Sequence, residues 1–206
     1  EGVHSTKKEI NTAIDEQPNI ENKNNTRLWG IVNKYLKLQN KENIAFNTSQ
    51  DLRTFYDDFV LDEVCREDAG DKPDGSIFRK GSVDVNANSK VIHRGVFPEK
   101  KIIDYMNKAL VVLQDDSIPN IIRISVYHYL FGYIHPFYNG NGRTSRFITS
   151  YYLSKIINPL VAYRLSITIK KSLRTYYKLF EVTNSYGNRG DITPFITGFM
   201  WLILKS

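Results

Sequence analysis

The spacing of apolar residues along the chain predicts a protein built mainly from α-helices. Apolar residues recur every three or four positions through most of the 206 residues, which is the period of a helix that buries one face. The segments with this period are residues 27–38, 49–67, 98–113, 119–134, 143–157, 167–184 and 191–204. The sequence contains no internal repeat or low-complexity segment, so we expect a compact helical domain.

Residues that favour helix ends support several of these boundaries. Ser49 is a suitable N-cap for the second segment, and the Gly/Asp/Pro cluster at residues 68–75 ends it. Pro98 fits the first turn of the third segment, while Asp191 opens the last segment with Pro194 in its first turn. The helical interpretation therefore rests on end signals as well as on period.

One stretch has the alternation of a β-strand instead. In SIFRKGSVDV, residues 76–85, side chains alternate between two faces, and Gly81 is suited to a turn. This pattern predicts a short hairpin centred near Gly81. The predicted fold class is therefore all-α with a short β-hairpin.

Composition narrows the functional classes without selecting one. The 28 Lys and Arg against 22 Asp and Glu give a net charge of +6, but the basic residues are scattered, which favours a small anionic ligand over nucleic acid. Cys65 is the only cysteine, so an intramolecular disulfide is excluded and a reducing, cytoplasmic location is expected. The apolar stretch 118–134 contains Asn120, Arg123 and His128, which indicates a buried helix rather than a membrane span.

The sequence HPFYNGNGRTSR, residues 135–146, carries the clearest chemical signal. Gly140 and Gly142 flank Asn141 just before a predicted helix, where glycine permits unusual backbone angles and the first helical N–H groups lack partners. Such a loop turns several N–H donors toward one point, which suits phosphate. A GNG sequence alone is more often a simple turn between helices.

Charged and titratable residues beside this loop strengthen the functional interpretation. Arg143 and Arg146 are three apart on the first turn of the following helix, so their guanidinium groups are expected on one face, gripping phosphate oxygens. His135 is expected at the C-terminal end of the preceding helix, which Pro136 stops. A base beside a bound phosphate suggests phosphoryl or nucleotidyl transfer to a hydroxyl.

The sequence HPFYNGNGRTSR resembles the signature of the Fic family, H-P-F-x-(D/E)-G-N-G-R-x-x-R, at every specified position except Asn139. IFRKGSVDV, residues 77–85, is similar to the family's flap hairpin, and residues 174–195 to the helix pair that closes its nucleotide pocket. The resemblance implies an all-α fold with a flap. It also implies a protein adenylyltransferase that moves AMP from ATP, with Mg²⁺, to a Ser, Thr or Tyr hydroxyl of a target protein.

The resemblance also implies a role for individual residues. His135 would deprotonate the target hydroxyl, Arg143 would contact the β-phosphate, and Arg146 the γ-phosphate. Phe137 would anchor the loop in the core, as its apolar bulk suits. The residues expected to bind the nucleotide are Gly140, Asn141, Gly142, Arg143, Arg146, Tyr177 and Asn184, the last two around adenine.

Residues outside the signature receive more ordinary interpretations. The flap is expected to bind a target segment as an added strand, through the backbone of Gly81, Ser82 and Val83. Arg79 matches a family arginine at the flap base. Even so, Arg79, His93 and Arg123 are interpreted as solvated or locally paired charges. His128 is interpreted as a core or supporting histidine.

Asn139 replaces the acid that holds Mg²⁺ in the family signature. Asparagine offers a carbonyl oxygen but no negative charge, so weak metal binding and slow transfer are expected. Two alternatives stay open on the sequence. The chain could be a nucleotide-binding pseudoenzyme, or it could transfer another phosphate-linked group such as UMP, GMP or phosphocholine.

The N-terminus suggests a division of the chain. Glu1 and Gly2 resemble the last two residues of the family's inhibitory motif, (S/T)-x-x-x-E-(G/N), whose glutamate pairs with the second arginine of the signature. The expected domains are an N-terminal segment, residues 1–23, and a Fic domain, residues 24–206. Glu1 is a candidate inhibitory contact of Arg146, and the chain is expected to be a fragment of a longer protein.

Overall fold

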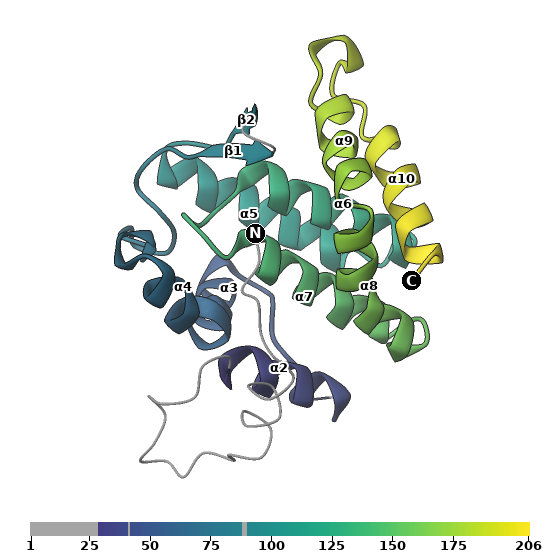
Figure 1. Cartoon of the computed structure of the whole chain (residues 1–206), viewed down its shortest axis with the longest axis horizontal. Helices are drawn as coiled ribbons and strands as arrows, with labels where there is room; N and C mark the ends of the chain where they lie inside the picture. The colour runs from purple at the N-terminus through teal and green to yellow at the C-terminus, as the bar shows by residue number, and fades with distance from the viewer. Residues whose placement is uncertain (1–28, 41, 88–89) are drawn as a thin grey trace.

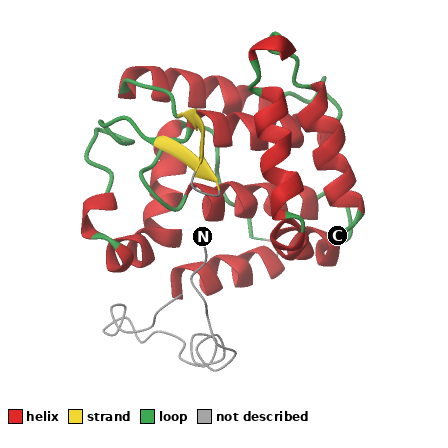
Figure 2. Cartoon of the chain, turned by 45° about the horizontal axis from the view of Figure 1, so that its top comes forward, coloured by secondary structure: helices red, strands yellow, loops and turns green. Residues whose placement is uncertain are grey.

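The computed structural model of this chain describes residues 29–40, 42–87 and 90–206, and in this part the chain is helical apart from one two-stranded hairpin (Figure 2). The predicted fold class is therefore confirmed. The longer helices are α2 (Trp29–Gln39), α3 (Ser49–Tyr56), α5 (Glu99–Gln114), α6 (Asn120–Ile134), α7 (Asn141–Ser154), α8 (Pro159–Lys171), α9 (Leu173–Thr183) and α10 (Thr193–Leu204). Shorter elements are η2 (Asp57–Leu61), α4 (Asp62–Glu67), η3 (Ala69–Asp71), β1 (Asp84–Ala87), β2 (Lys90–Arg94) and η4 (Tyr186–Asn188).

Helix α6 runs through the centre of the molecule (Figure 1). It packs against α5, α7 and α10, and its side chains Tyr127, Phe131 and Ile134 are buried in the core they share. A helix that is apolar on most sides is stable only when other elements surround it. The prediction of a buried helix at residues 118–134 is thus confirmed, and in the described part of the chain no helix is long and apolar enough to cross a membrane.

The helix predicted over residues 49–67 is one continuous rod made of α3, the π-helical turn η2 and α4. Its N-cap is Thr48 rather than the predicted Ser49. The Thr48 hydroxyl accepts a hydrogen bond from the Asp51 N–H at 3.1 Å, and Asp51 accepts one from the Thr48 N–H at 3.0 Å, which forms a capping box. Ser49 lies inside the helix, where its hydroxyl donates to Asn107 Oδ1 at 2.7 Å.

The hairpin begins later than the sequence pattern indicated. Strands β1 and β2 pair antiparallel with Val85 opposite His93, so Gly81 precedes the hairpin and does not form its turn. The predicted hairpin position was wrong because Phe78 is fully buried in the helical core. In addition, the Gly81 N–H donates to the Tyr138 hydroxyl at 2.7 Å.

The single helix predicted over residues 167–184 was also wrong, because α8 ends at Lys171 and α9 starts at Leu173. The apolar period continues through Ser172 because both helices bury a face, with Ile169 on one side of the break and Phe180 on the other. Helices α9 and α10 stand side by side at one end of the molecule (Figure 1), and α9 also faces the hairpin across α6 and α7.

Candidate active site

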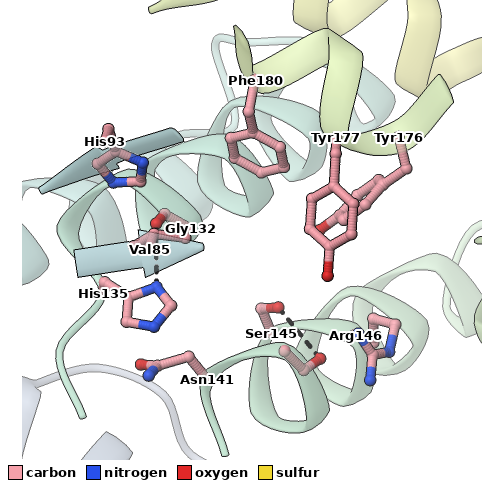
Figure 3. Close-up of a pocket in the computed structure, with 11 residues that line it drawn as sticks. Val85, His93, Gly132, His135, Asn141, Ser145, Arg146, Tyr176, Tyr177 and Phe180 are labelled. Carbon is pink, nitrogen blue, oxygen red and sulfur yellow. Dashed lines mark hydrogen bonds between the residues drawn. The ribbon is translucent and has the colours of Figure 1, made fainter. Parts of the chain in front are cut away.

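A pocket lies between the hairpin and α9, above the end of α6 and the start of α7 (Figure 3). Its empty space, including open solvent at the mouth, is about 550 Å³. The hairpin contributes Val85 and His93, α6 and its C-cap contribute Gly132 and His135, α7 contributes Asn141, Gly142, Ser145 and Arg146, and α9 contributes Tyr176, Tyr177 and Phe180. The pocket therefore has polar groups on its floor and aromatic rings on one wall.

His135 forms the C-cap of α6, as the sequence predicted, with left-handed backbone angles of φ 53° and ψ 64°. Pro136 favours this break because a residue before proline avoids helical angles. Nδ1 of His135 lies 3.4 Å from the carbonyl oxygen of Gly132, which only accepts hydrogen bonds, so this contact favours the tautomer with the proton on Nδ1 and the lone pair on Nε2. Burial, with smaller effects of His93 and Arg79, lowers the pKa of His135 to about 4. The imidazole is neutral at pH 7 and able to accept a proton.

Gly140 starts the part of the loop for which phosphate binding is predicted. It is the N-cap of α7 with φ 77°, and a Cβ there would lie 3.1–3.2 Å from side chains of Tyr56, Val60 and Val64. Only glycine suits both the angle and the close packing. Because α7 begins at Asn141, the N–H groups of its first turn have no acceptor within the helix. The helix starts two residues earlier than predicted, and Asn141 and Gly142 of its first turn line the pocket.

Asn141 has a structural role in addition to the phosphate contact proposed for it. Its Oδ1 accepts from the Phe137 N–H at 3.0 Å, and its Nδ2 donates to the Phe137 carbonyl at 2.8 Å. Phe137 is fully buried and its ring stacks on Tyr56 with centroids 3.6 Å apart, so its predicted function as the loop anchor is confirmed. The carboxamide of Asn141 keeps one N–H for a ligand.

The two arginines of the motif do not share one ligand-facing surface. Arg146 lines the pocket, and it has no hydrogen-bond or ion-pair partner among residues 29–40, 42–87 and 90–206. A Cβ at Gly142 would lie 2.9 Å from its Nη1, so glycine there leaves room for the guanidinium. Arg143 is outside the pocket lining and pairs with both carboxylate oxygens of Glu67, each at 3.2 Å. Positions three apart on a helix differ by about 60° around its axis, which is enough to direct Arg143 toward α4.

Asn139 is held inside a network of charged groups. Its Nδ2 donates to Glu67 Oε2 at 3.1 Å and to Asp71 Oδ2 at 3.0 Å. Its Oδ1 accepts from the Gly140 N–H at 2.6 Å and from Arg143 Nη2 at 3.3 Å. The only acceptor atom of this side chain is therefore already used within the protein. The residue at this position does not fit the Mg²⁺ ligand that the family signature implies.

Of the two residues expected around adenine, Tyr177 lines the pocket and Asn184 does not. Asn184 is the C-cap of α9, where its Oδ1 accepts from the Tyr129 hydroxyl at 2.7 Å. Tyr176 and Phe180, which line the pocket with Tyr177, were not predicted as site residues. Their spacing of four residues on one helix face is the signal that could have indicated them.

The predicted docking residues of the flap use some of their backbone groups within the chain. The Gly81 N–H is bound to Tyr138, the Gly81 carbonyl accepts from Arg79, and the Val83 carbonyl accepts from the Gly95 N–H at 2.9 Å. Ser82 is the exposed residue between them. Three of the six backbone N–H and C=O groups of these residues are thus bound within the chain, and the alignment of a target segment by strand addition at Gly81, Ser82 and Val83 stays a prediction.

Two residues interpreted as solvated or locally paired charges occupy interior positions instead. Arg79 is fully buried. His93 lines the pocket, with its ring stacked on Tyr133 at a centroid distance of 5.4 Å. Arg123 does fit that interpretation, because it forms an ion pair with Asp116 at 2.6 Å. Neither the buried position of Arg79 nor the half-buried position of His93 had a signal in local spacing, since partners of both come from distant segments.

His128 is the core histidine that the sequence indicated. It is fully buried, with Nδ1 2.7 Å from the Thr149 hydroxyl and Nε2 2.8 Å from the Tyr176 hydroxyl. Its ring stacks on Phe199 with centroids 4.3 Å apart. Burial, with a smaller effect of Arg146, lowers its pKa to about 3. This histidine joins α6, α7 and α9 below the pocket.

The low pKa of His128 makes stability depend on pH. The unfolded histidine takes up a proton below about pH 6.5, whereas the folded one stays neutral down to about pH 3. The unfolded state binds more protons between these values, so the free energy of unfolding contributed by His128 falls as pH drops through this range. Urea unfolding should show that His128→Gln is less stable than wild type near neutral pH and that the difference shrinks toward about pH 4. A difference that stays constant with pH would contradict the buried, neutral state.

The fold and the site define a helical protein whose pocket combines a neutral imidazole with the N-terminus of a helix. Residues 48–153, just over half of the chain, match the model of the Fic/DOC family. The chain belongs to this family.

Individual relatives agree with that assignment. The protein adenylyltransferases Fic of Drosophila grimshawi and Drosophila mojavensis are each 34% identical to it over 83 residues, which is 40% of this chain and 15% of theirs. The chain thus spans a small part of these curated relatives. A Fic family protein from Desulfovibrio desulfuricans G20 superimposes with a TM-score of 0.70 at 20% identity, over 98% of this chain and 57% of that chain. At this identity the likeness shows the fold alone.

Proposed function

We propose that this chain is a protein adenylyltransferase domain that transfers AMP from ATP to a Ser, Thr or Tyr hydroxyl of a target protein. The observation that carries the proposal is that neutral His135 and Arg146 line the same pocket, His135 at one side of its floor and Arg146 at the other (Figure 3). Within the described residues, Arg146 has no hydrogen-bond or ion-pair partner. Membership of the Fic/DOC family and the names of the Drosophila relatives support the same class of reaction.

The proposed reaction uses groups that the chain itself supplies. Nε2 of His135 accepts the proton of the target hydroxyl as the hydroxyl oxygen attacks the α-phosphorus of ATP. The bond from the α-phosphorus to the bridging oxygen breaks, and pyrophosphate leaves. Arg146 and the free N–H groups at the start of α7 stabilise the negative charge on the phosphates. Tyr176, Tyr177 and Phe180 form an aromatic wall suited to the base.

The direct test is incubation of the chain, with a lysate as the source of targets, with ATP labelled on the α-phosphate. Transfer predicts label on protein and free pyrophosphate, and mass spectrometry then identifies the modified hydroxyl. If protein is labelled by ATP that carries the label on its γ-phosphate only, the reaction is phosphoryl transfer instead. Isothermal titration against the four nucleoside triphosphates distinguishes ATP from another donor, since the phosphate site alone does not select the base.

A nucleotide-binding pseudoenzyme is the second candidate. The observations that favour it are the commitment of Asn139 to Glu67 and Asp71 and the pairing of Arg143 with Glu67. A site with these contacts could keep the phosphate cradle while stabilising the leaving group poorly. Tight binding of ATP with no transfer to any protein, including the chain itself, would support this candidate.

Restoring the acid by Asn139→Asp should make both turnover and stability depend on Mg²⁺. The new carboxylate would stand about 3 Å from those of Glu67 and Asp71, so repulsion should lower the melting temperature without a divalent cation. Mg²⁺ should restore the melting temperature and raise the rate of transfer on the order of tenfold, which corresponds to a lowering of the activation free energy by about 1.4 kcal/mol. Thermal unfolding and transfer rates, each with and without Mg²⁺, measure the two effects.

Asn139→Ala is the matched control, because it removes the same hydrogen bonds without adding charge. It should lose stability equally with and without Mg²⁺. If the aspartate variant behaves like the alanine variant in both measurements, the missing carboxylate is not what limits this protein.

The division of the chain is also a proposal. Glu1 and the whole segment 1–23 lie outside the described residues, so an inhibitory contact of Glu1 with Arg146 stays a prediction. The family match covers part of the proposed Fic domain, residues 24–206. We further propose a cytoplasmic location, on the ground that the single cysteine, Cys65, needs no oxidising compartment.

A further inference from the structure

Arg79 is a fully buried arginine between the entrance of the hairpin and the end of α6. Its Nε donates to the carbonyl of His135 at 2.9 Å, and its Nη1 donates to the carbonyl of Gly81. Its Nη2 donates to Val96 at 2.9 Å and to Ile134 at 3.4 Å. The guanidinium thus joins both ends of the hairpin to the last turn of α6.

The charge of Arg79 is compensated by peptide groups. Within the described residues, no carboxylate forms an ion pair with it. The carbonyls of Ile134 and His135 belong to the C-terminal end of α6, where unpaired carbonyl oxygens and the helix dipole concentrate negative charge. A buried cation at this point is therefore stabilised by the helix that ends in the proposed base.

The backbone at His135 needs such support. A left-handed conformation is unfavourable for a residue with a side chain, by about 1–2 kcal/mol. Arg79 binds three successive carbonyls around the turn, because its side chain reaches Ile134 and His135 and its own N–H donates to Pro136 at 3.3 Å. Gly95 permits the close approach, since a Cβ there would lie 2.6 Å from Nη2 of Arg79.

We propose that Arg79 is a positioning residue that fixes the left-handed turn at His135 and so aims the imidazole into the pocket. The proposal rests on the function proposed above for His135. Arg79 itself does not line the pocket, so it acts through the backbone of His135 and has no ligand contact there. The planar guanidinium with five donors matches several carbonyls at once, which an ammonium group cannot do.

The test compares Arg79→Lys with Arg94→Lys, because both arginines flank the hairpin and both changes keep the charge. Arg94 is exposed and pairs with Asp84 at 2.9 Å. For Arg79→Lys we expect kcat for AMP transfer to fall at least on the order of tenfold, with the Kd for ATP near that of wild type. The NMR signals of the His135 ring should also move. Arg94→Lys should change neither kcat nor the His135 signals.

The outcomes separate positioning from simple stability and from the proposed function. Unchanged His135 signals in a folded Arg79→Lys variant would overturn the proposal, whatever the rate. If Arg79→Lys does not fold, Gly95→Ala is used, because it keeps the guanidinium but pushes against it. The new Cβ would also lie 3.2 Å from the Cβ of His135, so the side-chain signals of Arg79 are recorded as well. The signals of both residues should move together; unchanged His135 signals, or a shift of His135 without a shift of Arg79, would overturn the proposal. If wild type transfers no AMP, the proposed function fails, while the ring signals still decide the role of Arg79.

Discussion

His135→Asn should lower the rate of AMP transfer by about 10²–10⁴, the usual contribution of a general base, while the affinity for ATP stays near that of wild type. Asparagine is close in size and polarity but cannot accept a proton at neutral pH. Within the described residues, the imidazole of His135 makes one hydrogen-bond contact, at 3.4 Å with the Gly132 carbonyl, so the substitution disturbs few side-chain hydrogen bonds. Single-turnover transfer of labelled AMP and calorimetric titration with ATP measure the two quantities.

The matched control is His93→Asn, which alters the other imidazole of the pocket. His93 is held by stacking on Tyr133, and its Nε2 lies 2.9 Å from the Tyr133 carbonyl, so it is oriented differently from the proposed base. Its replacement should change transfer much less. Transfer by His135→Asn at a rate close to wild type would show that His135 is not the base. A larger loss of transfer in the His93 variant would indicate that His93 is the base.

The parts of the site that the sequence predicted are those fixed by neighbours in the chain. Pro136 stops α6 next to His135, Gly140 supplies the left-handed N-cap of α7, and Phe137 provides the apolar bulk that holds the loop. Each depends on a backbone preference or a hydrophobicity that is intrinsic to the residue type and its immediate neighbour. The helical class was predicted for the same reason, since the period of three to four is local.

The parts that the sequence did not predict depend on partners far away in the chain. Arg143 is taken by Glu67, 76 residues earlier, and Arg79 reaches the carbonyl of His135, 56 residues later. No spacing rule connects such positions. Arg143 was therefore expected to contact the ligand, and Arg79 was interpreted as a solvated or locally paired charge. The hairpin was misplaced for a related reason, because alternation does not distinguish a strand from a loop whose Phe78 enters the helical core.

Arg146→Ala should weaken ATP binding by about 10- to 100-fold, because loss of a charged hydrogen bond costs about 1.5–3 kcal/mol. The guanidinium lines the pocket without an ion-pair partner in the part of the chain that the structure describes, so a phosphate does not have to displace a carboxylate to reach it. If its contact is the γ-phosphate, ADP should lose less affinity than ATP. Calorimetric titration with both nucleotides measures the difference, and equal losses would place Arg146 on the α- or β-phosphate.

Arg143→Ala is the matched control on the same helical turn, and it should weaken ATP binding less than Arg146→Ala. To reach a phosphate, Arg143 must leave the two carboxylate oxygens of Glu67, each 3.2 Å away. The gain of one contact then offsets the loss of another. Glu67→Gln removes this competition, so it should strengthen ATP binding in the wild-type background and have no effect in Arg143→Ala. A larger loss for Arg143→Ala than for Arg146→Ala would show that nucleotide binding separates Arg143 from Glu67 and that both arginines grip the phosphates.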